Sequence, residues 1–209
     1  MVREVAILTM SSKNGGYCVA GIDLENGEWI RLVSDDVSTH GALTNDDIKY
    51  SSGKYCEPLD VVRVPIIEYL PLEHQPENAL IDSTEYWEKV GTIDIENVLK
   101  IHPAEYHDVL LGNQYAYITE DGIYKVRESL ILVKVSDLII SYPKERSTKA
   151  SFTYRGTAYS DISVTDPDFY FLSDNLEFNK AILVMSLPES PLNGKYYYKF
   201  IAKIFPLYS

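Results

Sequence analysis

Residues 15–34, GGYCVAGIDLENGEWIRLVS, form the stretch from which the fold is predicted. Two runs of strand-forming residues flank Asn26 and Gly27, a dipeptide suited to a tight type I′ turn, so the stretch predicts a β-hairpin. That turn places Ile22 opposite Arg31. Both faces of the hairpin are mostly apolar, which predicts that it is covered on both sides rather than exposed at the edge of a sheet.

The rest of the first half predicts further strands and one helical section. Residues 4–10 (EVAILTM) and 60–69 (DVVRVPIIEY) have the composition of strands. Three short helices are predicted after them: one from Asp82 to Gly91, one over residues 94–100, and one over residues 103–112 with proline at its first position.

The second half is predicted to be nearly all strand. Apolar runs cover residues 129–140, 181–187 and 196–205. Residues 150–164 predict a second hairpin that turns at Arg155 and Gly156. Short strands with one helical interlude indicate a mostly β protein, built as two tandem OB-like small Greek-key barrels with a short helical insert.

Charge divides the chain into two parts. The protein has 209 residues and a net charge of −12. Residues 1–112 carry eight Lys and Arg against twenty Asp and Glu, whereas residues 113–209 carry eleven of each. This asymmetry predicts one barrel in residues 1–112 and a second in residues 113–209. It excludes phosphate neutralisation of DNA by the first half, which would require a basic surface. It also leaves a protein-interaction adaptor with an acidic first half as an alternative function.

Composition indicates a reduced, cytoplasmic protein. A hydrophobic fraction of 45% suits a packed core, and no apolar run is long enough to span a bilayer, so no membrane partner is expected. The N-terminal segment is too short and too acidic for a secretory signal. Cys18 and Cys56 are the only cysteines, and the four histidines lack ligand spacing. Neither a metal nor a cofactor is therefore expected.

Arg31 is the first candidate functional residue, because it is a cation among apolar residues and stands near Trp29 in the sequence. A guanidinium fork can bind a phosphate or a base edge, and the indole ring offers a stacking face. The structural alternative is an arginine stem packed on Trp29, with its head group paired to an acid such as Glu28 or Asp35.

The densest polar cluster of the sequence has four hydrogen-bonding side chains within five residues: His74, Gln75, Glu77 and Asn78. These side chains can bind the edge of a base or a ribose. The structural alternative is a rigid loop between Pro71 and Pro76 whose side chains cap the next helix. A catalytic alternative is an enzyme that acts on a nucleotide or modified base through His74 and Glu77, with Cys18 as a nucleophile.

An aromatic set in the second half predicts a nucleic-acid surface: Phe152, Tyr154, Arg155 and Tyr159. Lys144, Arg146 and Lys149 lie nearby in the sequence, and residues 195–199 (KYYYK) have a similar composition. Stacking contributes about 1–3 kcal/mol per base, and the cations attract the phosphate backbone. The structural alternative is ordinary cross-strand aromatic pairing on a barrel.

Several of these segments resemble the dual OB-fold-containing domain proteins, a prokaryotic family. The similar segments, in order, are YCVAG at 17–21, GEWIR at 27–31, HQPEN at 74–78, YRG at 154–156 and VTDP at 164–167. Leu32 departs from the family pattern, in which proline follows the arginine. The resemblance implies two tandem OB-like barrels and recognition of a nucleic acid or nucleotide, with bacterial defence systems as a setting. It also implies a ligand-binding role for Thr165 and Asp166, which the residues alone predict as the cap of a helical turn.

The function predicted from the sequence is non-enzymatic recognition of a nucleic acid or a nucleotide-like ligand. Trp29 and Arg31 would form a specific pocket with the polar cluster at residues 74–78. The aromatic set of the second half would supply the stacking surface.

Overall fold

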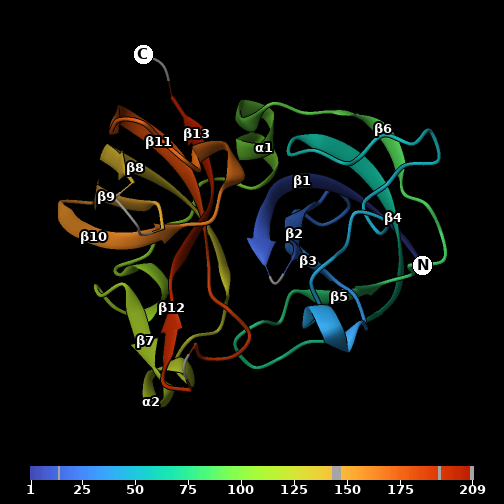
Figure 1. Cartoon of the computed structure of the whole chain (residues 1–209), viewed down its shortest axis with the longest axis horizontal. Helices are drawn as coiled ribbons and strands as arrows, with labels where there is room; N and C mark the ends of the chain where they lie inside the picture. The colour runs from blue at the N-terminus through green and yellow to red at the C-terminus, as the bar shows by residue number, and fades with distance from the viewer. Residues whose placement is uncertain (14, 143–146, 193, 208–209) are drawn as a thin grey trace. The chain divides into compact units, whose positions relative to one another are not determined.

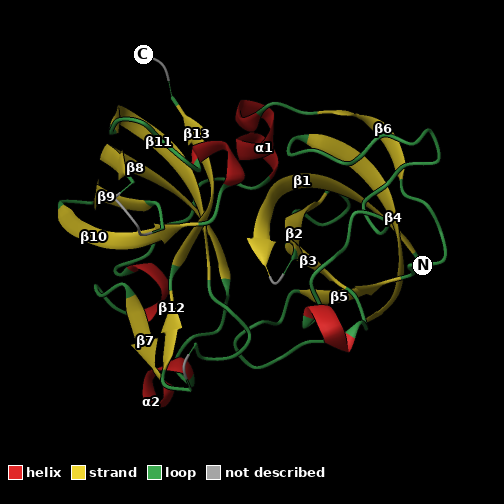
Figure 2. Ribbon diagram, viewed as in Figure 1, coloured by secondary structure: helices red, strands yellow, loops and turns green. Residues whose placement is uncertain are grey.

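The computed structural model describes residues 1–13, 15–142, 147–192 and 194–207 (Figure 1). The chain divides into two compact units: Met1–Leu72 with Pro76–Pro103 (unit 1), and Glu73–Gln75 with Ala104–Ser209 (unit 2). Backbone geometry thus places the change of unit at residue 103, whereas charge places it at residue 112. Strands dominate both units, and the helices are short (Figure 2). No helix in the described part of the chain has the length and apolar character needed to cross a membrane.

The strands of unit 1 are β1 (Val2–Lys13), β2 (Gly16–Asp23), β3 (Trp29–Val33), β4 (Asp60–Tyr69), β5 (Asn78–Ile81) and β6 (Glu88–Thr92). Because β1 pairs with both β2 and β4, five of them close into a barrel with the order β1-β2-β3-β5-β4. The β3–β5 pair is parallel, and the other pairs are antiparallel. β6 adds to β4 outside this ring.

Unit 2 repeats this topology with β8 (Leu130–Ser141), β9 (Lys149–Tyr154), β10 (Thr157–Val164), β11 (Leu176–Ser186) and β13 (Phe200–Pro206). They close in the order β8-β9-β10-β13-β11. The third and fifth barrel strands in sequence, β10 and β13, form the parallel pair, as β3 and β5 do in unit 1. Two OB-like barrels in tandem confirm the predicted fold class. A separate two-stranded ribbon pairs β7 (Tyr117–Thr119) with β12 (Tyr196–Tyr198).

The first strand of each barrel is irregular at the point where it must pair with two neighbours. The β1–β2 register shifts between Ile7 and Thr9, and the β8–β9 register shifts between Ser136 and Ile139. Such bulges bend a strand and increase its twist, which a small closed barrel requires. At Gly21 of β2, an added Cβ would lie 2.1 Å from a main-chain oxygen of β1, so only glycine allows the close approach of these strands.

Alternation of side chains separates the barrel cores from the outer faces. In β3, Ile30 and Leu32 belong to the unit 1 core, so Arg31 points to the other face of the strand. In unit 2, Phe152 and Tyr154 of β9 belong to the core. These faces decide which predicted site residues are accessible.

The first hairpin forms, but its register differs from the prediction. Ile22 pairs with Trp29 rather than with Arg31, because the Asp23 amide donates to the Glu28 carbonyl oxygen at 2.9 Å and makes the loop longer. Of the central pair predicted for a type I′ turn, Gly27 alone has a positive φ, whereas that turn needs two. The shift is two residues, so every side chain keeps its predicted face.

The helices are α1 (Ile95–Ile101), α2 (Glu120–Ile123), and the 3-10 turns η1 (Val37–Thr39), η2 (Leu110–Gly112) and η3 (Pro167–Phe169). Two predictions are confirmed: the helix predicted over residues 94–100 forms as α1, and Asp166 caps the helical turn η3. The helix predicted from Asp82 to Gly91 is wrong, because β6 pairs with β4 there and Trp87 is buried in the unit 1 core.

The helix predicted over residues 103–112 is also wrong, apart from the single turn of η2. The main-chain amides of this segment bond to the unit 2 barrel instead of to each other. The Glu105 amide donates to the Leu132 carbonyl oxygen at 2.7 Å, and the Leu110 amide donates to the Tyr159 hydroxyl at 3.1 Å. Tertiary hydrogen bonds therefore override the helix signals of Pro103 and Gly112.

Candidate functional site

Arg31 forms a buried ion pair with Glu77 in unit 1. The Arg31 amide donates to the Glu77 carbonyl oxygen at 2.8 Å, which aligns the two side chains. The Arg31 Nε and Nη2 atoms lie 3.4 and 3.5 Å from Glu77 Oε1, and the two residues are 7% and 9% exposed. A carboxylate beside the guanidinium favours the structural alternative for Arg31. A ligand contact through the same guanidinium stays a prediction.

Trp29 packs against α1 rather than standing alone. Its ring lies edge-on to the His102 ring, with 5.4 Å between centroids. His102 ends α1, and its Nδ1 atom lies 2.9 Å from the carbonyl oxygen of Gly27. These contacts fix the tip of the first hairpin on α1, with the indole half-buried.

The polar cluster predicted at residues 74–78 is divided between the two units. In unit 2, Gln75 is buried and its Nε2 atom donates to the Leu187 carbonyl oxygen at 3.0 Å, while His74 Nε2 lies 3.1 Å from a main-chain oxygen. Glu77 and Asn78 are buried in unit 1, where Asn78 begins β5. A common recognition edge made by all four side chains stays a prediction.

Asp166 is fully buried and holds the end of β10 to β13. Its carboxylate accepts from the Ile204 amide at 3.0 Å and from the Asp168 amide at 3.2 Å, and it lies 3.1 Å from Lys203 Nζ. Burial raises the pKa of Asp166, while the Lys203 cation acts in the opposite direction. The Thr165 amide adds a 2.9 Å bond to β13. Both residues therefore have a structural role, and the ligand contact implied by the family resemblance stays a prediction.

Three rings of the predicted nucleic-acid surface lie inside the unit 2 barrel. Phe152, Tyr154 and Tyr159 are 3%, 3% and 1% exposed, and the rings of Phe152 and Tyr159 stack with 5.4 Å between centroids. The structure corrects the prediction for these residues, because rings packed in a core present no free face to a base. Cross-strand pairing explains them.

Among the described residues, the cations near these rings do not form a surface with them. Arg155 is exposed at the β9–β10 turn, where its guanidinium carbon lies 3.4 Å from the centroid of the Tyr106 ring and Nη1 lies 3.6 Å from Asp108. Lys144 and Arg146 lie outside the described residues. Arg155 is thus the member of the predicted set that a ligand could reach.

A different aromatic group is accessible in unit 2, on one side of the β7–β12 ribbon. Its members, here called the tyrosine face, are Tyr115, Tyr117, Tyr196 and Tyr198. Tyr198 pairs with Tyr117, so alternation places Tyr117, Tyr196 and Tyr198 on the same side. The Tyr117 ring centroid lies 4.6 Å from that of Tyr196 and 6.0 Å from that of Tyr198, and the Tyr115 ring stacks on it at 6.4 Å.

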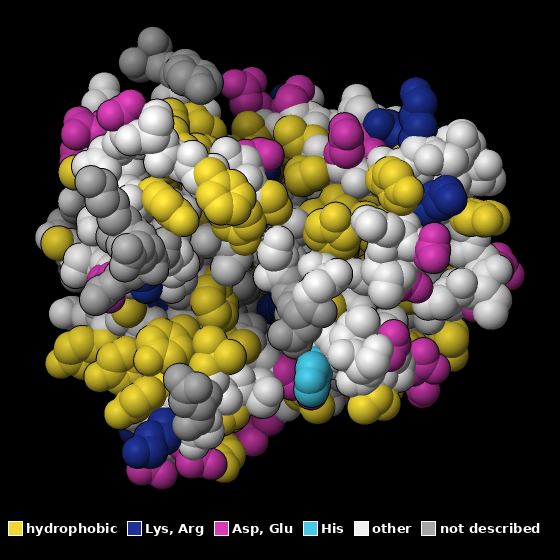
Figure 3. All heavy atoms as spheres, in the orientation of Figure 1, with side chains coloured by type: hydrophobic (Ala, Val, Ile, Leu, Met, Phe, Trp, Pro, Cys, Tyr) yellow, Lys and Arg dark blue, Asp and Glu magenta, His cyan; other side chains and the backbone are white. Residues whose placement is uncertain are grey.

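Two rings of the tyrosine face are open to solvent. Tyr115 is 69% exposed and Tyr117 is 37% exposed, while Tyr196 and Tyr198 of β12 are half-buried. Figure 3 shows yellow hydrophobic side chains, a class that includes tyrosine there, gathered over the position of β7 and β12 in Figure 1. The sequence contained a signal for this face, since Tyr115 and Tyr117 have strand spacing and KYYYK stands out, but the three-residue β7 was not predicted.

The opposite side of the ribbon is packed into unit 2. Ile118 and Tyr197 are buried there, and the Tyr197 ring meets His74 edge-on at 5.4 Å. Burial raises the pKa of Tyr197. An added Cβ at Gly122 of α2 would lie 2.8 Å from the Ile118 side chain, so this glycine allows α2 to pack on β7. Packing on this side therefore holds the ribbon, and with it the tyrosine face, in position.

Lys199 anchors the end of the ribbon. Its side chain is fully buried, and Nζ donates to the Leu110 carbonyl oxygen at 2.7 Å and to the Asn113 carbonyl and side-chain oxygens at 2.6 and 2.9 Å. Burial lowers the pKa of Lys199 to about 7. The lysine ties β12 to the segment that leads into β7.

The exposed charges that adjoin β12 and α2 in the sequence are of both signs. Lys195 precedes β12 and Lys125 follows α2, and both are exposed. Glu120 and Asp121, at the start of α2, are exposed as well. The two lysines are matched by these two acids, so the described charges here do not make a basic surface.

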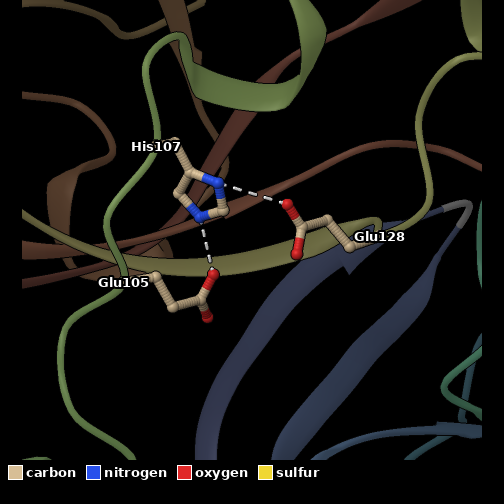
Figure 4. Close-up of side chains that lie close together, drawn as sticks. All are labelled: Glu105, His107 and Glu128. Atoms are coloured by element: carbon tan, nitrogen blue, oxygen red, sulfur yellow. Dashed lines mark hydrogen bonds and ion pairs between the residues drawn. The ribbon is translucent and has the colours of Figure 1, made fainter.

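A histidine between two carboxylates forms a second cluster in unit 2 (Figure 4). Glu105 Oε2 lies 2.8 Å from His107 Nε2, and Glu128 Oε1 lies 3.4 Å from His107 Nδ1. One ligand atom from each residue lies within 4.8 Å of the other two. The hydrogen bond to Glu105 and the charge of Glu128 raise the pKa of His107. Sequence reasoning missed this cluster, because Glu128 is distant in the sequence and residues 103–112 were predicted as a helix.

The chain was compared with known protein families and with solved structures. Among solved structures, the chain is similar to a murine DNA binding protein bound with double-stranded DNA, at 10% sequence identity and a TM-score of 0.39, over 99% of this chain and 98% of that chain. No curated protein matches the chain. The family model described as the dual OB-containing domain matches residues 3–204, nearly the whole length. The chain therefore belongs to the dual OB-containing domain family.

Proposed function

We propose that the chain is a non-enzymatic recognition module that binds single-stranded nucleic acid on the tyrosine face of unit 2. The observation that carries the proposal is the gathering of four tyrosine rings on one side of the β7–β12 ribbon, two of them open to solvent. Exposed aromatic rings on an OB-type barrel are the usual platform on which unpaired bases stack.

The position of the ribbon in the barrel supports this proposal. In unit 2, β11 is the fourth barrel strand and β13 is the fifth, so β12 lies in the loop between them. OB-folds bind oligonucleotides with the face of strands two and three and with the loops between strands one and two and strands four and five. The β12 half of the tyrosine face thus belongs to one of the loops that this class of barrel uses for ligands, which supports the proposal.

Stacking sets the expected strength of binding. Each stacked base contributes about 1–3 kcal/mol, and two rings are open. Two stacked bases alone correspond to a dissociation constant on the order of tens of micromolar or weaker. The proposed module therefore binds single strands with modest affinity, through bases more than through phosphates.

The overall charge favours a single strand over a duplex. A net charge of −12 opposes close approach to duplex DNA, whose recognition depends on phosphate neutralisation. Stacking needs bases whose faces are free, as they are in single strands. The charge argument and the stacking argument both favour single-stranded nucleic acid as the partner.

The other functions predicted from the sequence gain no further support. In the enzyme hypothesis His74 and Glu77 act on a nucleotide, but His74 Nε2 lies 3.1 Å from the Glu189 carbonyl oxygen, and Glu77 pairs with Arg31. A nucleotide pocket at Trp29 and Arg31, a protein partner for the acidic first half and a role in bacterial defence stay predictions.

The test is fluorescence anisotropy with labelled homopyrimidine DNA, homopyrimidine RNA and a duplex of equal length, at low salt. We expect binding to the single strands and weaker binding to the duplex. Replacing Tyr115 and Tyr117 together by alanine should weaken single-strand binding by about tenfold or more, the equivalent of 1.4 kcal/mol. Tyr86→Ala is the matched control, because Tyr86 is 63% exposed in unit 1 and lies outside the tyrosine face. Equal affinity of the double variant and the control would refute the proposal.

A further inference from the structure

The two carboxylates beside His107 stand at different distances from its ring nitrogens. The 2.8 Å separation between Nε2 and Glu105 Oε2 is that of a charge-assisted hydrogen bond. The 3.4 Å separation between Nδ1 and Glu128 Oε1 is longer than a good hydrogen bond of this kind. The Nε2 side of the imidazole ring therefore suits a hydrogen bond, whereas the spacing on the Nδ1 side is longer than a hydrogen bond needs.

The longer separation fits two ligands of one metal ion. Zinc binds histidine nitrogen and carboxylate oxygen at about 2.0–2.2 Å, so two such ligands at a tetrahedral angle lie about 3.3 Å apart. We propose that His107 Nδ1 and Glu128 bind a divalent metal ion of the zinc class, with Glu105 as a positioning residue and water in the remaining coordination positions. Glu128 has a side chain 45% exposed, so the ion and its waters can reach the site from solvent.

Glu105 selects the form of histidine that can bind a metal. A neutral imidazole carries one proton, and an Nε2 proton donated to Glu105 leaves the Nδ1 lone pair free to face Glu128. Glu105 is itself fixed, because its Oε1 accepts from the Leu132 amide at 3.2 Å and its own amide donates to the Leu132 carbonyl oxygen at 2.7 Å. Carboxylates that orient a metal-binding histidine in this way are common in zinc proteins.

The main chain of His107 is also fixed before any ion binds. Its amide donates to the Tyr154 hydroxyl at 2.8 Å, and its carbonyl oxygen accepts from Arg155 Nη1 at 3.1 Å. The two carboxylates attract a divalent cation, which competes with a proton for Nδ1. The cluster thus combines preorganised ligands with the correct sign of charge.

The proposal is tested by titrating the full chain, stripped of metal with a chelator, with zinc chloride in a calorimeter at neutral pH. We expect one zinc ion per chain and a rise in the melting temperature when zinc is added, because an ion that binds the folded state stabilises it. His107→Gln and Glu128→Gln should each lower the affinity for zinc at least tenfold. Glu105→Gln should lower it about 10–100-fold, because its amide would donate to Nε2 and shift the ring proton to Nδ1.

Glu120→Gln is the matched control, since Glu120 is an exposed glutamate of α2 outside the cluster. It should bind zinc like the unmodified chain. Melting curves recorded without zinc show whether each variant is folded. The proposal is overturned if the unmodified chain binds no zinc, or if His107→Gln binds it as tightly as Glu120→Gln does.

Discussion

Arg31 on β3 and Glu77, which directly precedes the parallel neighbouring strand β5, place a guanidinium and a carboxylate 3.4 Å apart in unit 1. Both residues are almost fully buried, so each charge contributes to compensating the other. Glu77→Gln removes the negative charge and leaves the positive one, so we expect the free energy of unfolding to fall by about 3–5 kcal/mol. Urea unfolding followed by circular dichroism measures the loss. A change below about 1 kcal/mol would mean that the pair behaves like an exposed one.

Arg31→Lys separates the structural role of this arginine from a ligand role. Lysine keeps the charge but loses the planar fork, so we expect lower stability with unchanged binding of single strands at the tyrosine face. Anisotropy and urea unfolding on the same variant provide both readouts. Loss of nucleic-acid binding at unchanged stability would instead place the guanidinium in contact with the ligand.

Replacement by alanine is expected to destabilise the protein strongly at Gly21 and hardly at all at Gly91. A Cβ at Gly21 would lie 2.1 Å from the Ala6 carbonyl oxygen, and main-chain atoms within a closed barrel cannot move away cheaply. Gly21→Ala should therefore lower the free energy of unfolding by about 3 kcal/mol or more. At Gly91 of β6 an added Cβ meets no atom within 4 Å, so Gly91→Ala should change it by about 0.5 kcal/mol at most. Thermal unfolding of the two variants side by side gives the comparison, and similar melting temperatures would contradict the close approach of β1 and β2.

The two hairpins show how far local sequence determines the fold. Arg155 and Gly156 have φ values of 49° and 80°, and the pairing of Tyr154 with Thr157 confirms the predicted two-residue turn. The dipeptide at residues 26–27 is a stronger turn signal, yet the first hairpin has a longer loop. Side-chain oxygens of Asp23 and Asn26 accept main-chain amides within that loop at 2.9 and 2.8 Å, an alternative that the dipeptide rule ignores. Faces were predictable there, but the register was not.

The candidate functional sites were predicted less well from the sequence than the strands were, because a site depends on which strands pair as well as on which face a side chain occupies. Phe152 and Tyr159 were expected on one face, and they are, but only the closed barrel shows that this face is the core. Glu77 is distant from Arg31 in the sequence and meets it through the parallel β3–β5 pair, which no local pattern indicates. In both cases the pairing of strands that are distant in the sequence decides what surrounds the side chain.

The lowered pKa of Lys199 predicts how the free energy of unfolding depends on pH. Burial lowers its pKa to about 7 in the folded protein, against about 10.4 in an unfolded chain. Between these values the unfolded chain binds more protons, so the free energy of unfolding should rise with pH by up to about 1.4 kcal/mol per unit. Below about pH 7 the contribution is constant, because the lysine is charged in both states. Lys199→Met removes the group, so the difference between the two proteins should grow from pH 7 to 10.

Urea unfolding of both proteins at intervals across this range makes the comparison. The three oxygen atoms within 2.9 Å of Nζ favour the charged form and oppose the effect of burial. Parallel pH curves for the two proteins would show that these oxygens compensate fully and that the pKa of Lys199 is not lowered.

The salt dependence of binding distinguishes stacking from phosphate attraction. Each phosphate neutralised on a single strand contributes about −0.7 to the slope of log affinity against log salt concentration. Lys195 directly precedes β12, Lys125 follows α2, and both are exposed, so contacts from these two lysines to two phosphates would give a slope of about −1.4. Anisotropy measured between about 50 and 300 mM salt provides the slope, and Lys195→Gln should make it shallower by about 0.7. A slope steeper than about −3 would mean that cations away from the tyrosine face dominate binding, because the two lysines cannot release that many counterions.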